Sequence, residues 1–399
     1  MRQKVVVIGH GYTSRLGVIR ALGRAGYEVI VVVMTNYKKD KITLNTKKPI
    51  DCYSKYVSQV FYCPSEQDTL IKLLIDQCAD RNQKVVLFPD SDFSEATIDD
   101  NQELLREHFL FPHIDHTSGA VIAWMDKMRQ KQAAKEVGLN VAEGWKIEVK
   151  DGFYEIPSDL RYPCFPKPIS TIVGGKGGLR RCVNEQQLRE VVMLLTKLNP
   201  TITLLVEEFK VIDTEHALLG FSDGKEVLIP GIIRMISLAN GGHFGVAKQG
   251  RIMPVTGFED LIEQFKQFVL KTRFVGIFDI DFYESEGRYY FCEMNFRYGG
   301  SGYAYTAMGV NLPDMLVRIL TGKSIDGMQR QITENAVYVN ERMCIDDWYR
   351  GFNTTKEYKQ LLSNSDISFV YDKTDNEPQK SFEKLFILLC IKRAIKKYL

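Results

Sequence analysis

Residues 276–302, GIFDIDFYESEGRYYFCEMNFRYGGSG, contain two apolar, strand-like runs that carry acidic and amide side chains. In the first run, Asp279 and Asp281 alternate with phenylalanine and isoleucine, so an extended strand places both carboxylates on one face. After a Glu-Gly turn, Glu293 and Asn295 share one face of the second run. A hairpin of these two strands would therefore bring Asp281, Glu293 and Asn295 together.

The side chains gathered by this hairpin are chemically suited to a divalent cation. Carboxylate and amide oxygens are hard ligands of the kind that Mg²⁺ uses when it also holds substrate phosphates. Arg297 continues the same face of the second run, where its guanidinium could hold an anion that the metal does not cover. The alternative interpretation of this segment, taken alone, is a two-stranded hairpin with a solvated polar face.

The composition is that of an ordinary globular protein. The chain has 399 residues, of which 45% are hydrophobic and 26% are charged, enough for two or three packed domains. Its 52 basic and 50 acidic residues give a net charge of +2, so no basic excess indicates a nucleic acid as the main partner. No apolar run approaches the ~20 residues of a membrane span, and we expect neither a transmembrane segment nor a signal peptide. The eight cysteines form no CxxC pair, which favours free thiols in a reducing, cytoplasmic location.

The N-terminal part of the chain predicts a doubly wound α/β domain. Residues 4–9 form a buried apolar strand, residues 16–25 have helical spacing and residues 27–34 form a second strand, which together make a βαβ unit. The glycine turn after the first strand lacks the third glycine of the dinucleotide fingerprint, because Ser14 stands there. No acidic residue ends the second strand, so we do not expect NAD binding. The turn is interpreted as a tight strand-to-helix connection.

Two adjacent features further along the chain could bind phosphate. Lys167 is flanked by prolines at the end of an expected strand. The prolines make the backbone rigid, so the direction of the lysine side chain is fixed. The run GGKGG at residues 174–178 follows, and glycines let backbone amides close on phosphate oxygens because no Cβ intervenes. It is not a Walker A loop, since Gly177 follows Lys176 where Ser or Thr is needed. A flexible hairpin tip is the alternative interpretation.

Residues 203–216, TLLVEEFKVIDTEH, form an expected strand that becomes acidic. Such a segment can offer backbone groups to an adenine edge and a carboxylate to ribose hydroxyls, with Glu207 and Glu215 as candidates. Two adjacent glutamates after an apolar strand are more often solvated, so this segment carries little weight by itself.

The order of these elements resembles the ATP-grasp superfamily. An aimed lysine, a glycine loop, the Val-Glu-Glu-Phe strand and the Glu-x-Asn-x-Arg strand follow one another as in that family. Within it, the chain looks most similar to carboxylate–amine ligases of the D-aspartate ligase type. The less specific motifs SKYV, at residues 54–57, and FPDSDF, at residues 88–93, are the basis for this similarity.

The resemblance implies a mixed α/β and α+β architecture, in which a doubly wound Rossmann-like domain precedes a two-subdomain ATP-grasp fold. We expect the Rossmann-like domain at residues 1–112 and the small ATP-grasp subdomain, with its glycine-rich loop, at residues 113–205. The metal-bearing subdomain would occupy residues 206–325. A C-terminal extension with a basic amphipathic helix would occupy residues 326–399.

The resemblance also implies roles for individual residues. Binding of the phosphates, adenine and ribose of ATP is implied for Lys127, Lys167, Gly174, Gly175, Gly177, Gly178, Glu207, Glu208, Phe209 and Glu215. Mg²⁺, as one or two ions with Mn²⁺ as an alternative, is implied at Asp281, Glu293 and Asn295. Asp279 competes with Asp281 for the metal, and the spacing to Glu293 favours Asp281. Arg297 would steady the transferred phosphoryl group or acyl phosphate, and Lys176 of the glycine loop is the second catalytic candidate.

The activity that the resemblance implies is ATP-dependent ligation of a carboxylate to an amine through an acyl phosphate, with release of ADP and phosphate. The alternatives are an ATP-grasp enzyme with another acceptor, either a carboxylase or a kinase, and a non-catalytic nucleotide-binding protein. The expected partners are a small-molecule carboxylate and amine, and Arg234, His243 and Ser301 are candidates to face them. A homodimer is expected from family likeness alone.

The chain ends in KLFILLCIKRAIKKYL, which predicts a short basic amphipathic helix. Such a helix could dock on an anionic membrane surface. We favour its packing on the enzyme or on a partner protein.

Overall fold

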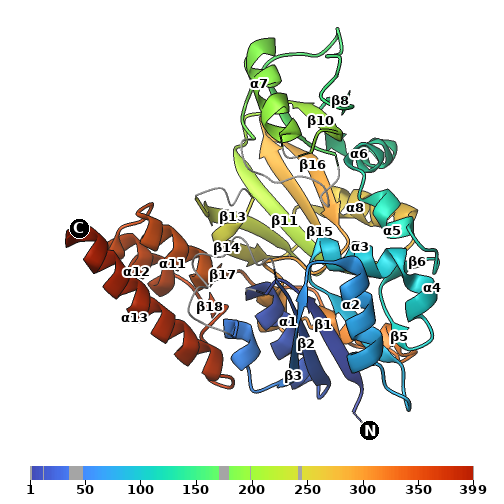
Figure 1. Ribbon diagram of the computed structural model, residues 1–399, viewed down its shortest axis with the longest axis vertical. Coiled ribbons are helices and arrows are strands. Elements are labelled where there is room, and N and C mark those ends of the chain that lie inside the picture. Colours follow the sequence, from blue (N-terminus) through green and yellow to red (C-terminus); the bar gives the residue numbers. More distant parts are fainter. Residues whose placement is uncertain are drawn as a thin grey trace.

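A computed structural model shows a central sheet surrounded by an N-terminal domain, a small subdomain and a helical C-terminal extension (Figure 1). It describes residues 2–11, 13–35, 48–169, 179–197, 199–240 and 245–398. The predicted glycine-rich loop, with Gly174, Gly175, Lys176, Gly177 and Gly178, lies outside these residues, as does His243.

The N-terminal domain is a parallel sheet with helices on both faces. Its elements are β1 (Lys4–Gly9), α1 (Thr13–Arg24), β2 (Glu28–Thr35), η1 (Ile50–Tyr53), β3 (Val57–Pro64), α2 (Gln67–Leu73), η2 (Leu74–Cys78), β4 (Val85–Pro89), α3 (Asp92–Asp100), α4 (Gln102–Leu105) and β5 (Phe109–Leu110). The strand order is β3-β2-β1-β4-β5. Val5 and Val7 share a core with α1, whereas Val6 and Ile8 share one with α2 and α3. Because alternate residues of β1 are buried on opposite faces, the predicted doubly wound domain is confirmed.

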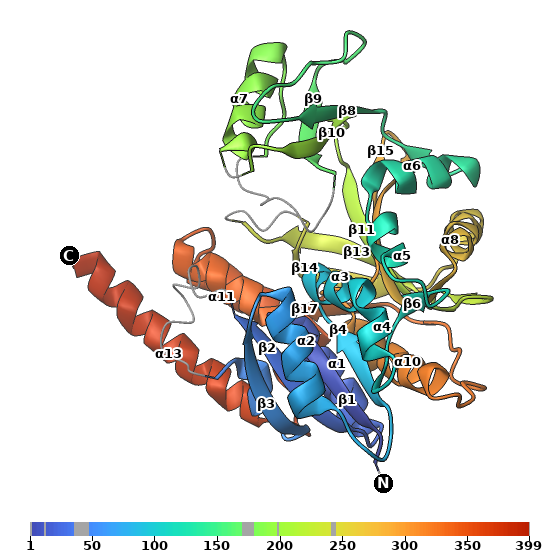
Figure 2. The same cartoon turned by 45° about the vertical axis from the view of Figure 1, so that its right-hand side comes forward.

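A small antiparallel sheet forms the upper subdomain in Figure 2, where α7 lies beside it. Its strands are β8 (Gly144–Val149), β9 (Cys164–Pro168) and β10 (Ile202–Glu208), in the order β8-β10-β9. Helix α7 (Glu185–Thr196) begins at the cap Asn184, whose Oδ1 accepts from the Gln187 amide at 3.0 Å. Leu188 and Val192 of this helix are buried against Leu204, so α7 closes one face and leaves the other toward the central sheet.

The central sheet is mostly antiparallel and has the order β18-β17-β14-β13-β11-β15-β16-β7. Its strands are β7 (Asn140–Val141), β11 (Thr214–Asp223), β13 (Ile232–Leu238), β14 (Ala247–Met253), β15 (Phe274–Ser285), β16 (Arg288–Asn295), β17 (Ala336–Val339) and β18 (Ile367–Ser368), with β12 (Val227–Leu228) on β11 and β6 (His113–Ile114) on β15. Phe265 and Phe268 of α8 (Glu259–Thr272) cover one face. On the other face, Ala217 and Leu219 share a core with β1 and with α10 (Leu312–Leu320), so the N-terminal domain packs there.

Two short helices and one longer one connect these parts. They are α5 (Ala120–Trp124), α6 (Lys127–Glu136) and α9 (Tyr303–Ala307). The expected boundaries at residues 205 and 325 stay proposals. Strands β6 and β7, from the predicted small subdomain, pair with β15 and β16 of the central sheet. Strands β17 and β18, from beyond residue 325, extend the other edge of the same sheet.

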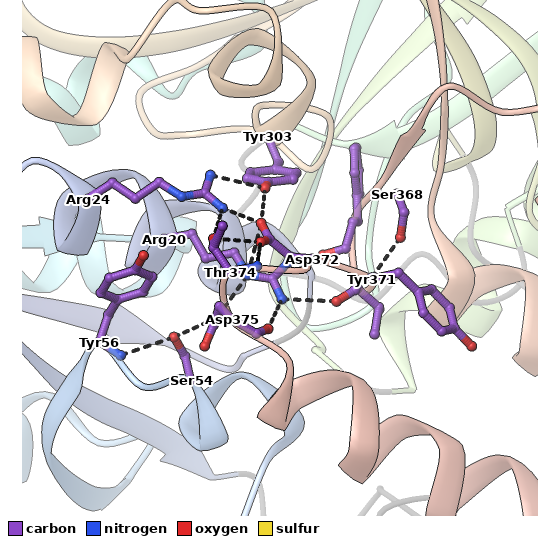
Figure 3. Close-up of polar contacts among 12 residues, drawn as sticks. Arg20, Arg24, Ser54, Tyr56, Tyr303, Ser368, Tyr371, Asp372, Thr374 and Asp375 are labelled. Atoms are coloured by element: carbon purple, nitrogen blue, oxygen red, sulfur yellow. Dashed lines mark hydrogen bonds and ion pairs between the residues drawn. The ribbon is translucent and has the colours of Figure 1, made fainter.

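The C-terminal extension is fastened to the N-terminal domain by a buried polar network (Figure 3). Arg20 and Asp375 are both buried, and Arg20 Nε lies 2.9 Å from Asp375 Oδ2. The same guanidinium donates to the carbonyl oxygens of Phe369 and Val370 at 2.8 and 2.9 Å. Ser54 Oγ donates to Asp375 at 2.8 Å. The buried Arg20 guanidinium and the buried Asp375 carboxylate thus both have hydrogen-bond partners. The network therefore attaches the C-terminal extension to the N-terminal domain.

The helices of this extension are α11 (Glu341–Arg350), α12 (Thr355–Ser363) and α13 (Glu377–Tyr398). The last is 22 residues long, so the prediction of a short amphipathic helix was wrong in length. Phe382 and Leu389 are buried against the body, while Ile387 and Ile391 are exposed, so apolar residues occupy two faces rather than one. No helix in the described part of the chain is long and apolar enough to cross a membrane.

Candidate functional site

The acidic hairpin forms with the register that its alternation predicts. Asp281 of β15 lies directly opposite Glu293 of β16, and Asp279 lies opposite Asn295. Asn295 Nδ2 donates to Asp281 Oδ2 at 3.4 Å. A β-bulge at Cys292 interrupts the register beyond this pair, toward the turn. The three predicted metal ligands therefore share one face of the central sheet.

The two aspartates of β15 have different surroundings. Asp279 is 8% exposed, and a Cβ at Gly299 would overlap its carboxylate. Burial raises the pKa of Asp279 to about 7, although Arg297 acts in the opposite direction. Asp281 is only half-buried. Asp281 is thus the more accessible carboxylate for a ligand that approaches from outside.

Three lysines surround this hairpin. Lys127 Nζ lies 2.9 Å from Glu293 Oε2. Lys167 of β9 lies 2.7 Å from Glu207 Oε2, and Lys131 lies 2.5 Å from Glu207 Oε1. Each of these lysine side chains is at most 13% exposed, so three ammonium groups share two carboxylates in a poorly solvated place. Such an arrangement favours a polyanionic ligand.

The charge balance can be followed at Glu207 and Lys131. Burial by itself would raise the pKa of Glu207, but Lys167 and Lys131 outweigh it and hold the pKa below its usual value. Burial lowers the pKa of Lys131, with Lys167 adding to the effect and Glu207 opposing it. Glu207 lies between Lys131 and Lys167 and pairs with both, which offsets the repulsion between the two ammonium groups.

Local sequence explains how α6 positions its two lysines. Asp126 Oδ1 accepts from the amides of Met128 and Arg129 at 2.8 and 2.9 Å, so the helix begins at Lys127. Positions four apart lie on the same helical face, which places Lys131 beside Lys127. Sequence reasoning identified Lys127 and missed Lys131, although this spacing was the signal that could have found it.

Gln130 of the same helix ties α6 to β16. Its Nε2 donates to the Met294 carbonyl at 2.9 Å, and its Oε1 accepts from the Met294 amide at 2.8 Å. These two hydrogen bonds satisfy both backbone polar groups of Met294, which lies between Glu293 and Asn295. The lysine face of α6 is therefore fixed relative to the acidic hairpin.

Arg297 reaches into the N-terminal domain. Its Nε lies 2.6 Å from Asp92 Oδ1 at the start of α3. Sequence reasoning placed Arg297 in the site and gave Asp92 no role. A cavity of ≈ 10 Å³ is lined by Asp92, Lys127, Glu293 and Asn295, among others. It has room for about one water molecule, so a phosphate group could enter only if these side chains moved.

The segment that follows Glu207 offers a ligand fewer free backbone amides than the sequence predicted. The Glu208 amide donates to the Glu143 carbonyl at 2.9 Å, and the Phe209 amide donates to the Pro163 carbonyl at 3.0 Å. Glu208 is also 2.8 Å from Lys210. Both amide donors are thus used within the protein, and the adenine-binding role of this segment stays a prediction.

The remaining candidates are not among the side chains gathered around Asp281 and Glu293. Glu215 and Arg234 line a cleft of ≈ 510 Å³ between β11 and β13. Ser301 lies in the turn before α9 and lines neither this cleft nor the small cavity beside Lys127. In the described residues, no group of three or more His, Cys, Asp or Glu side chains is arranged to hold a metal.

The sequence places the chain in a family of ATP-binding domains. The sequence pattern of the family described as "Carbamoyl-phosphate synthase L chain, ATP binding domain" matches residues 126–328, half of the chain. The chain therefore belongs to this ATP-grasp family. The match contains α6, the small subdomain and the acidic hairpin, and so includes each of the three lysines described above.

One similar curated protein is the carbamoyl phosphate synthase large chain of Agathobacter rectalis, which is 24% identical over 198 residues. The alignment covers 49% of this chain and 18% of that protein. The chain thus spans less than a fifth of the length of this relative.

Three solved structures share the fold at low sequence identity. The L-amino acid ligase from Bacillus licheniformis has a TM-score of 0.61 and 15% identity, covering 84% of this chain and 79% of that one. N5-carboxyaminoimidazole synthetase from Staphylococcus aureus, complexed with ADP, has a TM-score of 0.61 and 16% identity, covering 90% and 87%. The biotin carboxylase domain dimer of 2-oxoglutarate carboxylase from Hydrogenobacter thermophilus, in complex with MgADP, ADP and bicarbonate, has a TM-score of 0.61 and 17% identity, covering 84% and 74%.

Proposed function

We propose that the protein is an ATP-dependent carboxylate–amine ligase, of the D-aspartate ligase type, that forms a carbon–nitrogen bond through an acyl phosphate. The observation that carries the proposal is the meeting of Lys127, Lys131 and Lys167 with the carboxylates of Glu207 and Glu293. The lysines would bind the phosphates of ATP, and Glu215, on the same sheet face as Asp281, would bind the ribose. The similar L-amino acid ligase supports this choice of reaction.

The hairpin residues fit Mg²⁺ by their chemistry. Asp281 and Glu293 are directly opposite each other on neighbouring strands, so their carboxylate oxygens can meet on one cation. The amide oxygen of Asn295 adds a third hard ligand. We infer that these three residues hold one or two Mg²⁺ ions, with Mn²⁺ as a substitute. Bound there, the metal would neutralise charge on the phosphates of ATP.

The chemistry requires two displacements. A carboxylate oxygen of the first substrate attacks the γ-phosphorus of ATP, the bond from that phosphorus to the bridging oxygen breaks, and ADP leaves. The amine nitrogen of the second substrate then attacks the acyl carbon, the bond from that carbon to the phosphate oxygen breaks, and phosphate leaves as the nitrogen loses a proton.

Bringing a carboxylate to a triphosphate is the main electrostatic obstacle. Two like charges ~4 Å apart cost about 4 kcal/mol at an effective dielectric constant near 20. In this proposal Lys127 and Lys167 offset that repulsion from the nucleotide side, and Arg297 offsets it where the phosphoryl group is transferred. Asp92 orients Arg297 through its 2.6 Å ion pair.

The test is a screen of amino acids and other carboxylates, each paired with an amine, in which ATP-dependent phosphate release is measured. Mass spectrometry then looks for a product lighter than the two substrates by one water. Phosphate release only when carboxylate and amine are both present is the expected result. Release with bicarbonate or an alcohol as sole acceptor would indicate a carboxylase or a kinase instead, and ATP binding without turnover would indicate a nucleotide-binding protein.

A further inference from the structure

Arg234 and Arg251 lie on the face of the central sheet opposite the acidic hairpin. Asp281 is opposite Ala217 on β11, and Ala217 is opposite Ile233 on β13. Side chains alternate along a strand, so Arg234 points to the other face. Arg234 is directly opposite Arg251 on β14, which therefore shares that other face.

The two guanidinium groups are an unbalanced pair of positive charges. Like charges directly opposite on neighbouring strands destabilise the pairing. Arg318 and Arg350 each form an ion pair with an aspartate. In the part of the chain that the structure describes, no ion pair joins Arg234 or Arg251 to a carboxylate, and both side chains are exposed.

Asp213 and Glu215 also line the cleft, and Glu284 shares the Arg234 face, but no ion pair joins these carboxylates to the two arginines in the described residues. Asp213 Oδ2 accepts from the Glu286 amide at 2.8 Å and is thereby directed to the turn of the acidic hairpin. Glu215 lies opposite Tyr283, which shares the Asp281 face, so its side chain also points to that face. An external anion is then the simplest group that would relieve the repulsion between the two arginines.

Arg234 and Arg251 are part of a built cleft with an apolar wall. The backbone pairing of β11 and β13 stops at His216 and Arg234, and beyond that point the cleft of ≈ 510 Å³ opens between the two strands. Ile212 and Ile236 are each 47% exposed at its wall, and Leu238 is 38% exposed. This volume is within the range of small-molecule sites, which combine apolar walls with a few polar groups that fix orientation.

We propose that this cleft is a second small-molecule site, next to the proposed nucleotide site, for an anion that carries an apolar chain or ring. The guanidinium groups of Arg234 and Arg251 bind the anionic group, for which their planar donor geometry is suited. Ile212, Ile236 and Leu238 contact the apolar part. The cleft shares Glu215, the proposed ribose ligand, with the nucleotide site but none of the lysines or hairpin carboxylates, so binding of the anion does not require the proposed ligase activity.

The test uses the fluorescent sulfonate 8-anilinonaphthalene-1-sulfonate as the probe, titrated into the full-length protein. Saturable binding is expected, and Arg234→Gln and Arg251→Gln should each weaken it about tenfold, the size expected for loss of a charge-assisted hydrogen bond. Arg81→Gln removes the same charge from an exposed position in the N-terminal domain and should leave binding unchanged. Arg234→Lys and Arg251→Lys keep the charge without the planar guanidinium and should each give an intermediate affinity.

Competition separates this site from a general apolar surface. 4-Methylpentanoate should displace the probe, and its neutral amide should not. Equal displacement by the acid and the amide would overturn the proposal. Unchanged affinity in the Arg234→Gln/Arg251→Gln double variant would do the same, with thermal unfolding curves verifying that the variants are folded.

Discussion

Lys127 Nζ lies 2.9 Å from Glu293 Oε2, which joins the start of α6 to the strand that carries the predicted metal ligands. In this arrangement Lys127, which we propose binds phosphate, is paired with a carboxylate that the proposed metal would need. Binding of ATP with its metal would therefore exchange one partner for another, with the lysine moving to phosphate and the carboxylate moving to the cation. The ammonium group of Lys127 and the carboxylate of Glu293 already lie side by side, so in this proposal the site is preorganised for ATP and its metal.

Replacement of the hairpin carboxylate tests this arrangement. Glu293→Ala should lower kcat by about a hundredfold or more, by analogy with loss of one preorganised electrostatic contact. The measurement is steady-state ADP release with the substrates that the screen identifies. Glu103→Ala removes an exposed carboxylate from the N-terminal domain and is the matched control. A near-normal kcat in Glu293→Ala would remove this residue from the mechanism.

Lys131 is predicted to bind nucleotide although the sequence reasoning overlooked it. Lys131→Ala leaves Glu207 with Lys167 alone and should raise the Kd for ATP about tenfold or more. Lys135→Ala, one helical turn further along α6 and exposed, should bind ATP normally. Calorimetric titration of both variants decides the point, and equal affinities would show that Lys131 is only structural.

The buried pair that fastens the C-terminal extension should matter for stability. Asp375→Ala leaves the buried Arg20 guanidinium with only the more distant Asp372 carboxylate, 3.9 Å from its Nε, which should cost about 3 kcal/mol of unfolding free energy. The exposed pair of Lys380 and Glu377 provides the comparison, since Glu377→Ala should cost no more than about 1 kcal/mol. Urea unfolding measures both, and similar small losses would mean that the network in Figure 3 contributes little.

Glu341 gives a pH dependence of stability with a defined sign. Burial raises its pKa to about 7, although hydrogen bonds from Ser368 and from the amides of Phe369 and Val370 act in the opposite direction. Its ordinary pKa is near 4.5, so the folded protein binds a proton that the unfolded chain releases between these values. Stability from this group is therefore complete below pH 4.5 and is lost as the pH rises through 7.

The wild type should thus lose stability relative to Glu341→Gln as the pH is raised from 5 to 8. The pKa difference corresponds to at most about 3 kcal/mol, of which most should appear in this interval. Urea unfolding of both proteins at several pH values gives the difference directly. A difference that stays constant from pH 5 to 8 would mean that Glu341 titrates normally.

Patterns among residues close together in the sequence predicted the features that depend on local structure. The register of Asp281 with Glu293 follows from alternation within a hairpin, because only a few residues separate the strands. The buried runs of β1 and β2 similarly predicted a parallel sheet covered on both faces. These features depend on local geometry, which a single sequence carries.

Contacts between distant parts of the chain could not be predicted in this way. The pair of Arg297 with Asp92 joins residues 205 positions apart, and no local pattern relates them. The same holds for the pairing of β17 with β14. The face to which Arg234 points depends on which strands neighbour β13, so alternation alone did not place it.

The most direct test of the account is the structure of the protein with a non-hydrolysable ATP analogue and Mn²⁺, located by its anomalous scattering. The account predicts Mn²⁺ bound to oxygen atoms of Asp281, Glu293 and Asn295, with Lys127 moved from Glu293 to a phosphate oxygen. Nucleotide bound elsewhere, with the Asp281 and Glu293 carboxylates directed into solvent, would contradict it.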